Sequence, residues 1–310
     1  MTCYGDGTSV PSLQENAIKV FITGGTGLVG SAVVADLLAH DHTVDVLARS
    51  AASARAVLAA GGTPVHGSLA DLEVIRNAAE QADGVIHLAF ANDFSSPEAL
   101  DRAIAEETAA LNALGETLIG TDRPLVTVSG TPSVPGRVST EADPIPTDGP
   151  VGGRGRTVSA ILALASRGVR ASAVRLPRTV HNNGNGGFAG LLTTIARSSG
   201  VSGYPGDGTQ RWPAVHALDA SVLFRLALES APAGSSWHAV DDEGVAVRDI
   251  AEVIGRRLGV PVEQVPTDTF GPIGPVFAMD QPSSSAATRE QLGWRPTHPK
   301  LIADLENIQP

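Results

Sequence analysis

A short glycine-rich turn near the start of the chain constrains the fold more than any other feature. Residues 18–23 form an apolar run that predicts a buried strand, and Gly24, Gly27 and Gly30 follow at intervals of three. Residues 28–39 then have the apolar spacing of a helix, so the glycines lie between a strand and a helix. Such a turn lets backbone approach an anion closely and presents the helix N-terminus to it.

Strands and helices alternate through the first half of the chain. Strands are expected at 43–48, 84–89, 125–129 and 169–175, and helices at 71–81 and about 97–118. This alternation predicts right-handed βαβ units and therefore an α/β fold with a doubly wound parallel sheet of the Rossmann type. In that context the glycine turn predicts dinucleotide binding. The alternative is a turn that needs glycines for its shape alone.

The end of the second expected strand bears on the choice of dinucleotide. An acidic residue there accepts hydrogen bonds from the ribose 2′-OH of NAD, whereas an arginine accommodates the 2′-phosphate of NADP. Arg49 and Ser50 occupy this point, and Asp45 lies earlier, inside the strand. The sequence therefore favours NADP(H) over NAD(H), the alternative being an arginine exposed on a loop.

Composition and local patterns suggest three parts. Residues 1–16 lack the basic start and apolar stretch of a secretory signal and are expected to form a disordered tail. Residues 17–180 are expected to form the dinucleotide-binding domain, and 181–310 a smaller substrate-binding part interleaved with the sheet. In the latter, loops are expected at 181–187 and 200–208, a helix at 247–258, and a loop or lid at 265–285.

Charge and hydropathy exclude several classes of function. The 310 residues carry a net charge of −11 and include no basic cluster, which argues against nucleic acid as a partner. The apolar runs are shorter than the roughly 18 residues that a membrane-spanning helix needs. Cys3 is the single cysteine, so no intramolecular disulfide forms, and no Cys/His spacing suggests a metal site. A cytoplasmic protein is expected.

Six segments resemble, in order along residues 18–305, the extended short-chain dehydrogenase/reductases of the NAD-dependent epimerase/dehydratase group. The resemblance is greatest to atypical members described as NAD(P)-dependent oxidoreductases, and it implies a small-molecule substrate and a homodimer. The segments are 23–30 (TGGTGLVG), 86–89 (IHLA), 126–129 (VTVS), 174–177 (VRLP), 215–219 (VHALD) and 291–296 (QLGWRP).

The resemblance also implies a set of cofactor contacts. Ser68 and Leu69 lie where the family touches the adenine, although the family often has Asp at the Ser68 position. Residues 88–90 would line the ribose and pyrophosphate, and Pro177 and Val180 would face the nicotinamide. The full expected set is Gly24, Thr26, Gly27, Leu28, Val29, Gly30, Arg49, Ser50, Ser68, Leu69, Leu88, Ala89, Phe90, Pro177 and Val180.

The catalytic pair of the family is missing. In the family a Tyr donates the proton, a Lys four residues later lowers its pKa, and a Ser or Thr some 25 residues earlier holds the substrate oxygen. Thr131 matches that hydroxyl, but residues 154–162 (RGRTVSAIL) contain neither Tyr nor Lys. The standard proton relay is therefore excluded, whereas hydride transfer, which is chemistry of the cofactor, is not.

Other residues near the carboxyl ends of the expected strands become candidates, because open α/β sheets bind ligands there. Thr131 or Ser129 would orient the polar substrate atom, and a loop histidine, His181, or Tyr204 or an ordered water would supply the proton. The full set of catalytic candidates is Thr131, Ser129, His181, Tyr204 and Asp93. For the last three, a turn or exposed-loop residue without a chemical role is the alternative.

Two further residues are candidates for substrate contact. By the resemblance, Arg211 would bind an anionic substrate group, with Trp212 beside it; the alternative is an ion pair between Arg211 and Asp207. Downstream, Asp219 is expected to cap a helix, and His216 to be structural.

Three functions remain open on the sequence. The leading hypothesis is an NADP(H)-dependent oxidoreductase that acts on a small carbonyl, imine or enone substrate with a non-standard proton donor. A repurposed non-redox enzyme on the same fold (a cyclase, isomerase or dehydratase) is the second. A cofactor-sensing regulatory protein is the third.

Overall fold

The computed structural model describes residues 17–91, 96–149 and 151–309. The expected tail at 1–16 and the candidate Asp93 lie outside the described residues.

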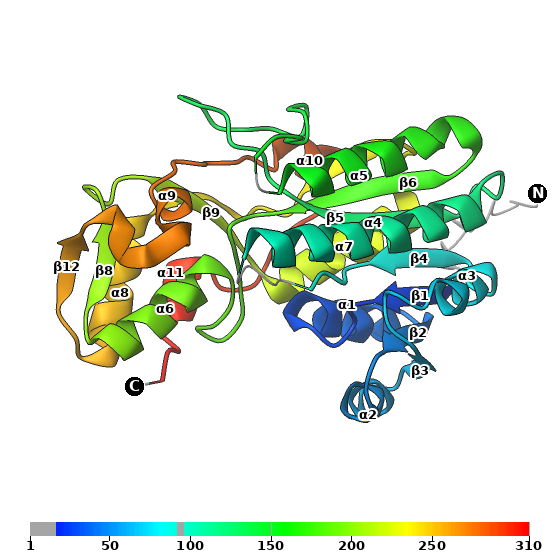
Figure 1. Cartoon of the computed structure of the whole chain (residues 1–310), viewed down its shortest axis with the longest axis horizontal. Coiled ribbons are helices and arrows are strands. Elements are labelled where there is room, and N and C mark those ends of the chain that lie inside the picture. Colours follow the sequence, from blue (N-terminus) through cyan, green and yellow to red (C-terminus); the bar gives the residue numbers. More distant parts are fainter. Residues whose placement is uncertain (1–16, 92–95, 150, 310) are drawn as a thin grey trace, which may run out of the picture.

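A seven-stranded parallel sheet forms the centre of the larger lobe (Figure 1). Its order is β10-β6-β5-β4-β1-β2-β3, so the direction of winding reverses between β1 and β4. In such sheets a crevice opens at the carboxyl ends of the strands on either side of the reversal. The strands are β1 (Lys19–Thr23), β2 (Thr43–Ala48), β3 (Thr63–His66), β4 (Gly84–His87), β5 (Pro124–Gly130), β6 (Arg170–Leu176) and β10 (Ser235–His238).

Helices cover both faces of this sheet, and alternate residues of β1 show why. Val20 and Ile22 point into a core with α1 and α7, whereas Phe21 points into a second core with α3, α4 and α5. A strand buried on both faces is apolar throughout, as residues 20–22 are. The helices of this lobe are α1 (Leu28–Ala39), α2 (Ala51–Ala59), α3 (Leu72–Glu80), α4 (Pro97–Leu118), α5 (Gly152–Ala163) and α7 (Ala217–Ser230), with the 3₁₀ helix η1 (Leu164–Arg167).

A smaller lobe, at the left of Figure 1, has its own core around Trp212 and Phe277. It contains a three-stranded sheet, β11-β9-β7, and a two-stranded sheet, β12-β8. Its strands are β7 (Thr179–His181), β8 (Ser202–Pro205), β9 (Arg211–His216), β11 (Asp242–Ala246) and β12 (Val262–Val265). Its helices are α6 (Gly187–Ser199), α8 (Val247–Leu258), η2 (Thr267–Ile273), α9 (Gly274–Phe277) and α11 (Leu301–Leu305), and α10 (Ala286–Gln291) lies near β10.

The described elements confirm the predicted fold class and correct two of the predicted loops. The expected helix at 247–258 and strand at 43–48 coincide with α8 and β2. The loops expected at 181–187 and 200–208 are partly wrong, since His181 ends β7 and residues 202–205 form β8. The sequence of β8 (SGYP) has little strand propensity and is held by pairing with β12, a long-range contact.

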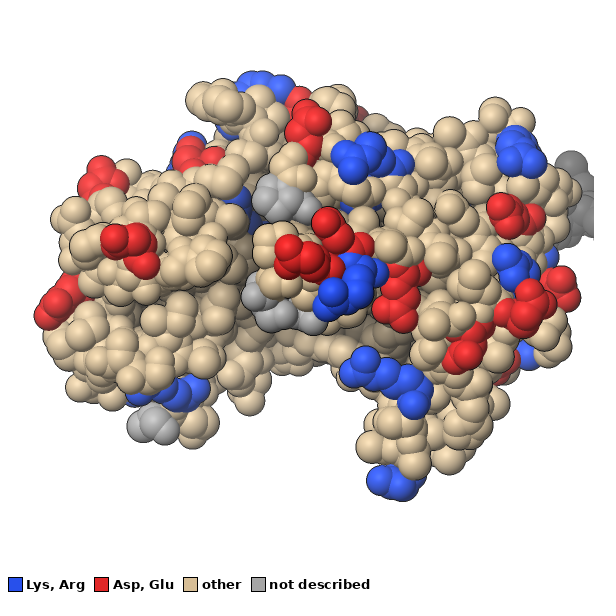
Figure 2. Space-filling view, in the orientation of Figure 1, with Lys and Arg blue, Asp and Glu red and all other residues tan. Residues whose placement is uncertain are grey.

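Within these ranges, no helix is both long and apolar enough to cross a membrane. Figure 2 shows charged side chains gathered over the larger lobe and an indentation of the lower edge between the smaller lobe and α2.

Candidate dinucleotide and substrate site

The three glycines of the turn have different steric surroundings. Gly24 has φ +75°, and a Cβ on it would lie 2.7 Å from the backbone nitrogen of Ala89. A Cβ on Gly30 would lie 2.0 Å from the Gly24 carbonyl oxygen. Around Gly27 the only such contact is the same oxygen at 3.5 Å. Gly24 and Gly30 are thus needed for packing, whereas Gly27 leaves the outer side of the turn open to a ligand.

The turn leads directly into the N-terminus of α1. Gly27 is the N-cap and has no side chain to accept a hydrogen bond from the first N–H groups, and the first turn contains no acidic residue. Leu28 is 41% exposed at this end. Unoccupied N–H groups and the helix dipole together favour a phosphate here. A small cavity of about 90 Å³ adjoins the turn and is lined by Gly25, Thr26, Ser31, Val34, Ala56, Val57 and Ala60.

Arg49 follows the last residue of β2, next to the N-terminus of α2. Its side chain is exposed and forms no ion pair within the described residues. Ser50 caps α2, since its Oγ accepts a hydrogen bond from the Ser53 backbone N at 3.1 Å. Asp45 binds the Lys19 Nζ at 2.9 Å and lies inside β2. The carboxylate of β2 thus lies inside the strand, and Arg49 and Ser50 follow at its end.

The expected adenine and ribose contacts lie along the same edge. The Ser68 backbone N and Oγ both donate to Asp71, at 2.7 and 2.9 Å, which orders the turn before α3. Leu88 donates its backbone N–H to the Thr23 carbonyl at 3.1 Å. The segment after β4 is thereby held against the glycine turn. At the far end of this edge, Pro177 and Val180 are buried.

His87 is a core residue. Its Nδ1 lies 2.9 Å from the Thr23 Oγ1, and the side chain is fully buried. Burial, reinforced by the charge of Arg154, lowers the pKa of His87 to about 3. The ring is therefore neutral at physiological pH and is not available as a general acid.

Helix α5 contains the segment in which the family has its Tyr and Lys. A Cβ on Gly155 would lie 1.9 Å from the Pro146 carbonyl oxygen, so no side chain fits at this position. Arg154 instead forms a two-pronged ion pair with Glu107 of α4, with both N···O distances 2.7 Å. Its guanidinium lies 4.0 Å from the centre of the Phe90 ring. An ion pair with a buried carboxylate and a partly exposed guanidinium thus lies beside the expected ribose contacts.

Thr131 lies just beyond β5, and its backbone N donates to the Leu176 carbonyl at 3.0 Å. Gln281 donates its Nε2 to the Thr131 carbonyl and lies 3.5 Å from the Thr131 Oγ1. Ser129 is paired with Arg175 of β6 and is partly exposed. Both hydroxyl candidates therefore lie at the carboxyl edge of the sheet, and sequence reasoning missed Gln281 as the neighbour of Thr131.

Gln281 belongs to residues 278–285, here named the crossing segment, which connects the two lobes. Ser283 donates its backbone N–H to the Glu243 carbonyl at 2.8 Å, and its Oγ lies 2.7 Å from the Ser139 Oγ. The sequence predicted a loop or lid over 265–285. That prediction is partly wrong, since 267–277 form η2 and α9, and only the crossing segment is a loop. This loop reaches Thr131 through Gln281.

The expected position of His181 is wrong. It ends strand β7 instead of lying in a flexible loop, and it is fully buried. Its Nδ1 lies 3.0 Å from Asp304 of α11, and its ring meets that of His216 edge-on at 5.4 Å. Asp304 lies more than 120 residues after His181 in the chain, so the sequence around His181 did not indicate this contact.

Tyr204 and Trp212 contribute to the core of the smaller lobe. Trp212 is fully buried, with its ring centre 5.2 Å from that of Phe277, so the expected substrate contact by its side chain is wrong. Side chains alternate along β9, and Trp212 points inward where Arg211 points outward. Tyr204 packs against the same core, and the guanidinium of Arg248 lies 5.3 Å from its ring.

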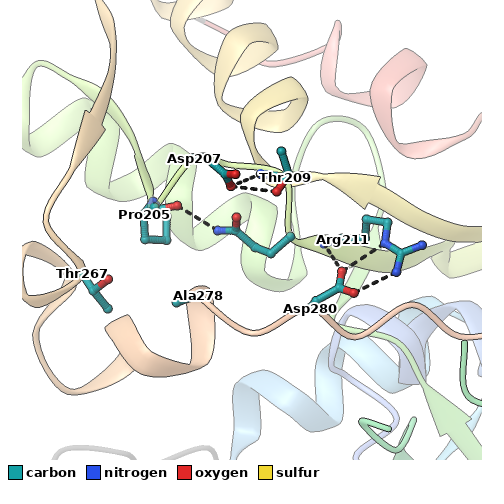
Figure 3. A pocket seen from close by; sticks show the side chains of 9 residues that line it. Pro205, Asp207, Thr209, Arg211, Thr267, Ala278 and Asp280 are labelled. Atoms are coloured by element: carbon teal, nitrogen blue, oxygen red, sulfur yellow. Dashed lines mark hydrogen bonds and ion pairs between the residues drawn. The ribbon is translucent and has the colours of Figure 1, made fainter. Parts of the chain in front are cut away.

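Arg211 lines an open cavity of about 470 Å³ between β8, β9 and the crossing segment (Figure 3). Its partner is Asp280, with N···O distances of 3.1 and 2.8 Å, and not Asp207, which binds Thr209. This pairing lowers the pKa of Asp280. The positive charge of Arg211 is thus already balanced.

Asp219 is not the cap of α7. His216 has that role, since its Nδ1 accepts a hydrogen bond from the Leu218 backbone N at 3.2 Å. Asp219 instead accepts hydrogen bonds from the backbone N–H groups of Thr297 and His298, at 2.9 and 3.0 Å. In the described part of the chain, no group of three or more His, Cys, Asp or Glu side chains is placed to bind a metal.

Comparisons with known proteins agree with this geometry. Residues 20–240 match the model of the NAD dependent epimerase/dehydratase family. The uncharacterized protein C2A9.02 of Schizosaccharomyces pombe is 43% identical over 294 residues, which cover 93% of this chain and 98% of that protein.

Solved structures show the same fold. UDP-glucose 4-epimerase of Thermotoga maritima, crystallised with UDP-glucose, matches with a TM-score of 0.77 at 20% identity, over 93% of this chain and 96% of that one. DesIV, the dTDP-glucose 4,6-dehydratase of Streptomyces venezuelae with NAD bound, matches with a TM-score of 0.74, 20% identity and the same coverage. The chain belongs to the NAD-dependent epimerase/dehydratase family of enzymes.

Proposed function

We propose that this protein is an NADP(H)-dependent oxidoreductase that acts on a small carbonyl, imine or enone substrate with a non-standard proton donor. The glycine turn is the observation that carries the proposal. Backbone atoms leave no room for a side chain at Gly24 and Gly30, whereas there is space beside Gly27 and the N-terminus of α1. That combination fits a pyrophosphate. Arg49 at the end of β2, with Asp45 inside the strand, favours a 2′-phosphate.

Bound NADPH supplies a hydride, and the protein must place the acceptor carbon and provide for the proton. Thr131, which is buried and held by Gln281 and the Leu176 carbonyl, and the partly exposed Ser129 are the two hydroxyls that would orient a polar substrate atom. His87 is neutral and buried, and His181 is buried against Asp304, so neither supports proton donation. We therefore propose water as the proton source, which suits an activated double bond because its carbanion is protonated after hydride transfer.

Titration calorimetry with NADP⁺, NADPH, NAD⁺ and NADH tests the cofactor. We expect binding of NADP(H) at least about tenfold tighter than that of NAD(H), since a 2′-phosphate with one arginine is a charge-assisted contact. A spectrophotometric screen of small aldehydes, ketones, imines and enones with NADPH tests the redox chemistry. Binding without oxidation of NADPH by any of these substrates would contradict an oxidoreductase.

A repurposed non-redox enzyme is the second candidate, and α5 is the observation that favours it. The family's Tyr and Lys are missing, and at Gly155 the space for a side chain is closed by the Pro146 carbonyl. A cyclase, isomerase or dehydratase that uses the crevice without hydride transfer would keep its turnover after the cofactor is stripped by charcoal, whereas the proposed oxidoreductase would lose it. The homodimer and the cytoplasmic location stay predictions.

A further inference from the structure

Arg178 lies at the carboxyl edge of the main sheet, between β6 and β7. The neighbouring carbonyl of Leu176 accepts the hydrogen bond from Thr131, so Arg178 and Thr131 stand just past the ends of adjacent strands. The crossing segment touches both of them, through Met279 at Arg178 and through Gln281 at Thr131. Arg178 is therefore a neighbour of the proposed substrate position.

The guanidinium of Arg178 has no acidic partner in the described structure. Its Nη2 reaches the Met279 Sδ at 3.6 Å, a weak acceptor, and its Cζ lies 5.4 Å from the centre of the Phe188 ring. Its Nε is buried and makes no hydrogen bond within the described residues. Burial alone lowers the pKa of Arg178 to about 10, so the group stays charged at neutral pH but is poorly solvated.

Two other arginines near the crevice are neutralised, whereas Arg49 is unpaired within the described residues but exposed to solvent. Arg154 is paired with Glu107, and Arg211 with Asp280, each through two hydrogen bonds. This contrast arises in a chain that has 33 acidic and 22 basic residues, so carboxylates are abundant. A desolvated charge without a counter-ion is costly, and an anionic ligand would remove that cost.

We propose that Arg178 binds a carboxylate or phosphate group of the substrate beside Thr131. The planar guanidinium offers paired N–H donors that match two oxygens of such a group. Partial burial strengthens the attraction relative to water. This inference rests on the proposed function and narrows it to small substrates that carry an anionic group next to the reacting carbon. Arg211 is not expected to bind the anionic group of the substrate, because its guanidinium is already paired with Asp280.

Titration calorimetry with malonate and with inorganic phosphate tests the site, on the protein both free and saturated with NADP⁺. Malonamide, the neutral counterpart of malonate, controls for shape. We expect malonate or phosphate to bind the unmodified protein at least about tenfold more tightly than Arg178→Met, with Arg178→Lys between them, whereas malonamide should not bind. Whichever anion binds more tightly identifies the group as a carboxylate or a phosphate.

Arg167→Met is the matched control. Arg167 is an exposed arginine of η1 that precedes β6, at the opposite edge of the sheet, and it has no acidic partner in the described structure either. Its replacement should leave anion binding unchanged.

Two results would overturn the proposal. Equal anion affinity in Arg178→Met and the unmodified protein, including no binding to either, would show that Arg178 holds no anion. A tenfold loss of NADP⁺ affinity in Arg178→Met would instead assign Arg178 to the cofactor pyrophosphate. Since the anions are also titrated without NADP⁺, failure of the cofactor hypothesis is seen separately from failure of this one.

Discussion

The glycine turn at 24–30 and the start of α5 lie close together but are built differently. Gly24 packs on Ala89, the next residue is Phe90, and Arg154 of α5 lies over the Phe90 ring. At the turn, the proposed ligand site would be made of backbone whose shape requires glycine. At α5, the family's chemistry depends on two side chains, and this chain has a Glu107–Arg154 ion pair close by instead.

This difference separates binding from catalysis. A backbone site is preserved as long as the turn folds, whereas a side-chain site changes with two substitutions. On the proposed function, the protein would keep the family's cradle for a dinucleotide without the Tyr and Lys that move a proton in the family.

Gly30→Ala should have the largest effect. Its Cβ would lie 2.0 Å from a backbone oxygen, so the turn must move, and we expect a loss of about 3 kcal/mol in the free energy of unfolding with at least a 100-fold loss of NADP⁺ affinity. Gly27→Ala is the control, with about 1 kcal/mol lost and cofactor affinity reduced about tenfold. Urea denaturation and calorimetry measure both. Equal stability losses in the two variants would show that the turn is more compliant than its geometry indicates.

The stability of the larger lobe should fall in acid. Folding lowers the pKa of His87 from 6.5 to about 3 by burial, and that of His238 to about 4. A depressed histidine pKa means that the unfolded chain binds more protons, so stability is full above pH 6.5 and is lost as the pH falls toward 4. One such group loses about 1.4 kcal/mol per pH unit, or about 3 kcal/mol over this window.

Urea denaturation at pH 7, 5.5 and 4.5 measures this loss, and His87→Gln should make it smaller although the variant is less stable at pH 7. A loss of the same size in His87→Gln would assign the acid sensitivity to other groups.

Two arginines of the crevice should respond in opposite ways to the same change. Arg154→Met leaves the carboxylate of Glu107, which is 2% exposed, without its partner, and we expect a loss of about 2 kcal/mol, reduced because Arg154 is partly exposed. Arg178→Met removes an unpaired charge, so the free energy of unfolding should stay unchanged or rise. Thermal denaturation compares the two, and Glu107→Leu with Arg154→Met should recover most of the loss. A clear destabilisation by Arg178→Met would contradict the unpaired state of Arg178.

The sequence predicted the elements whose signals are local. Helices α1 and α8 and strand β2 begin and end where apolar periodicity placed them, and the glycine turn lies between a strand and a helix as the sequence predicted. Such signals depend on neighbours within a few residues along the chain.

The surroundings of the candidate site residues depend on long-range contacts, which a single sequence does not show. Three side-chain contacts join residues at least 69 positions apart in the chain. Asp304 contacts His181, Gln281 donates a hydrogen bond to Thr131, and Asp280 pairs with Arg211. Arg178 gave no sign in the sequence, because its distinguishing property is that no acidic side chain among the described residues pairs with it. Trp212 was misplaced for a related reason: it alternates with Arg211 on one strand, and only the fold shows which of the two points inward.

Arg49→Met should have the smallest effect, because Arg49 follows β2 and would contact only the 2′-phosphate of the cofactor. Arg49 is exposed and pairs with no acidic residue in the described structure, so its loss should leave the melting temperature unchanged. It should weaken NADPH binding about tenfold and NADH binding not at all, since only NADPH has the 2′-phosphate. Calorimetry with both nucleotides, with the exposed Arg102→Met as control, measures the ratio. If both affinities fall equally, Arg49 supports the turn in general, and the preference for NADP(H) must come from other residues or be absent.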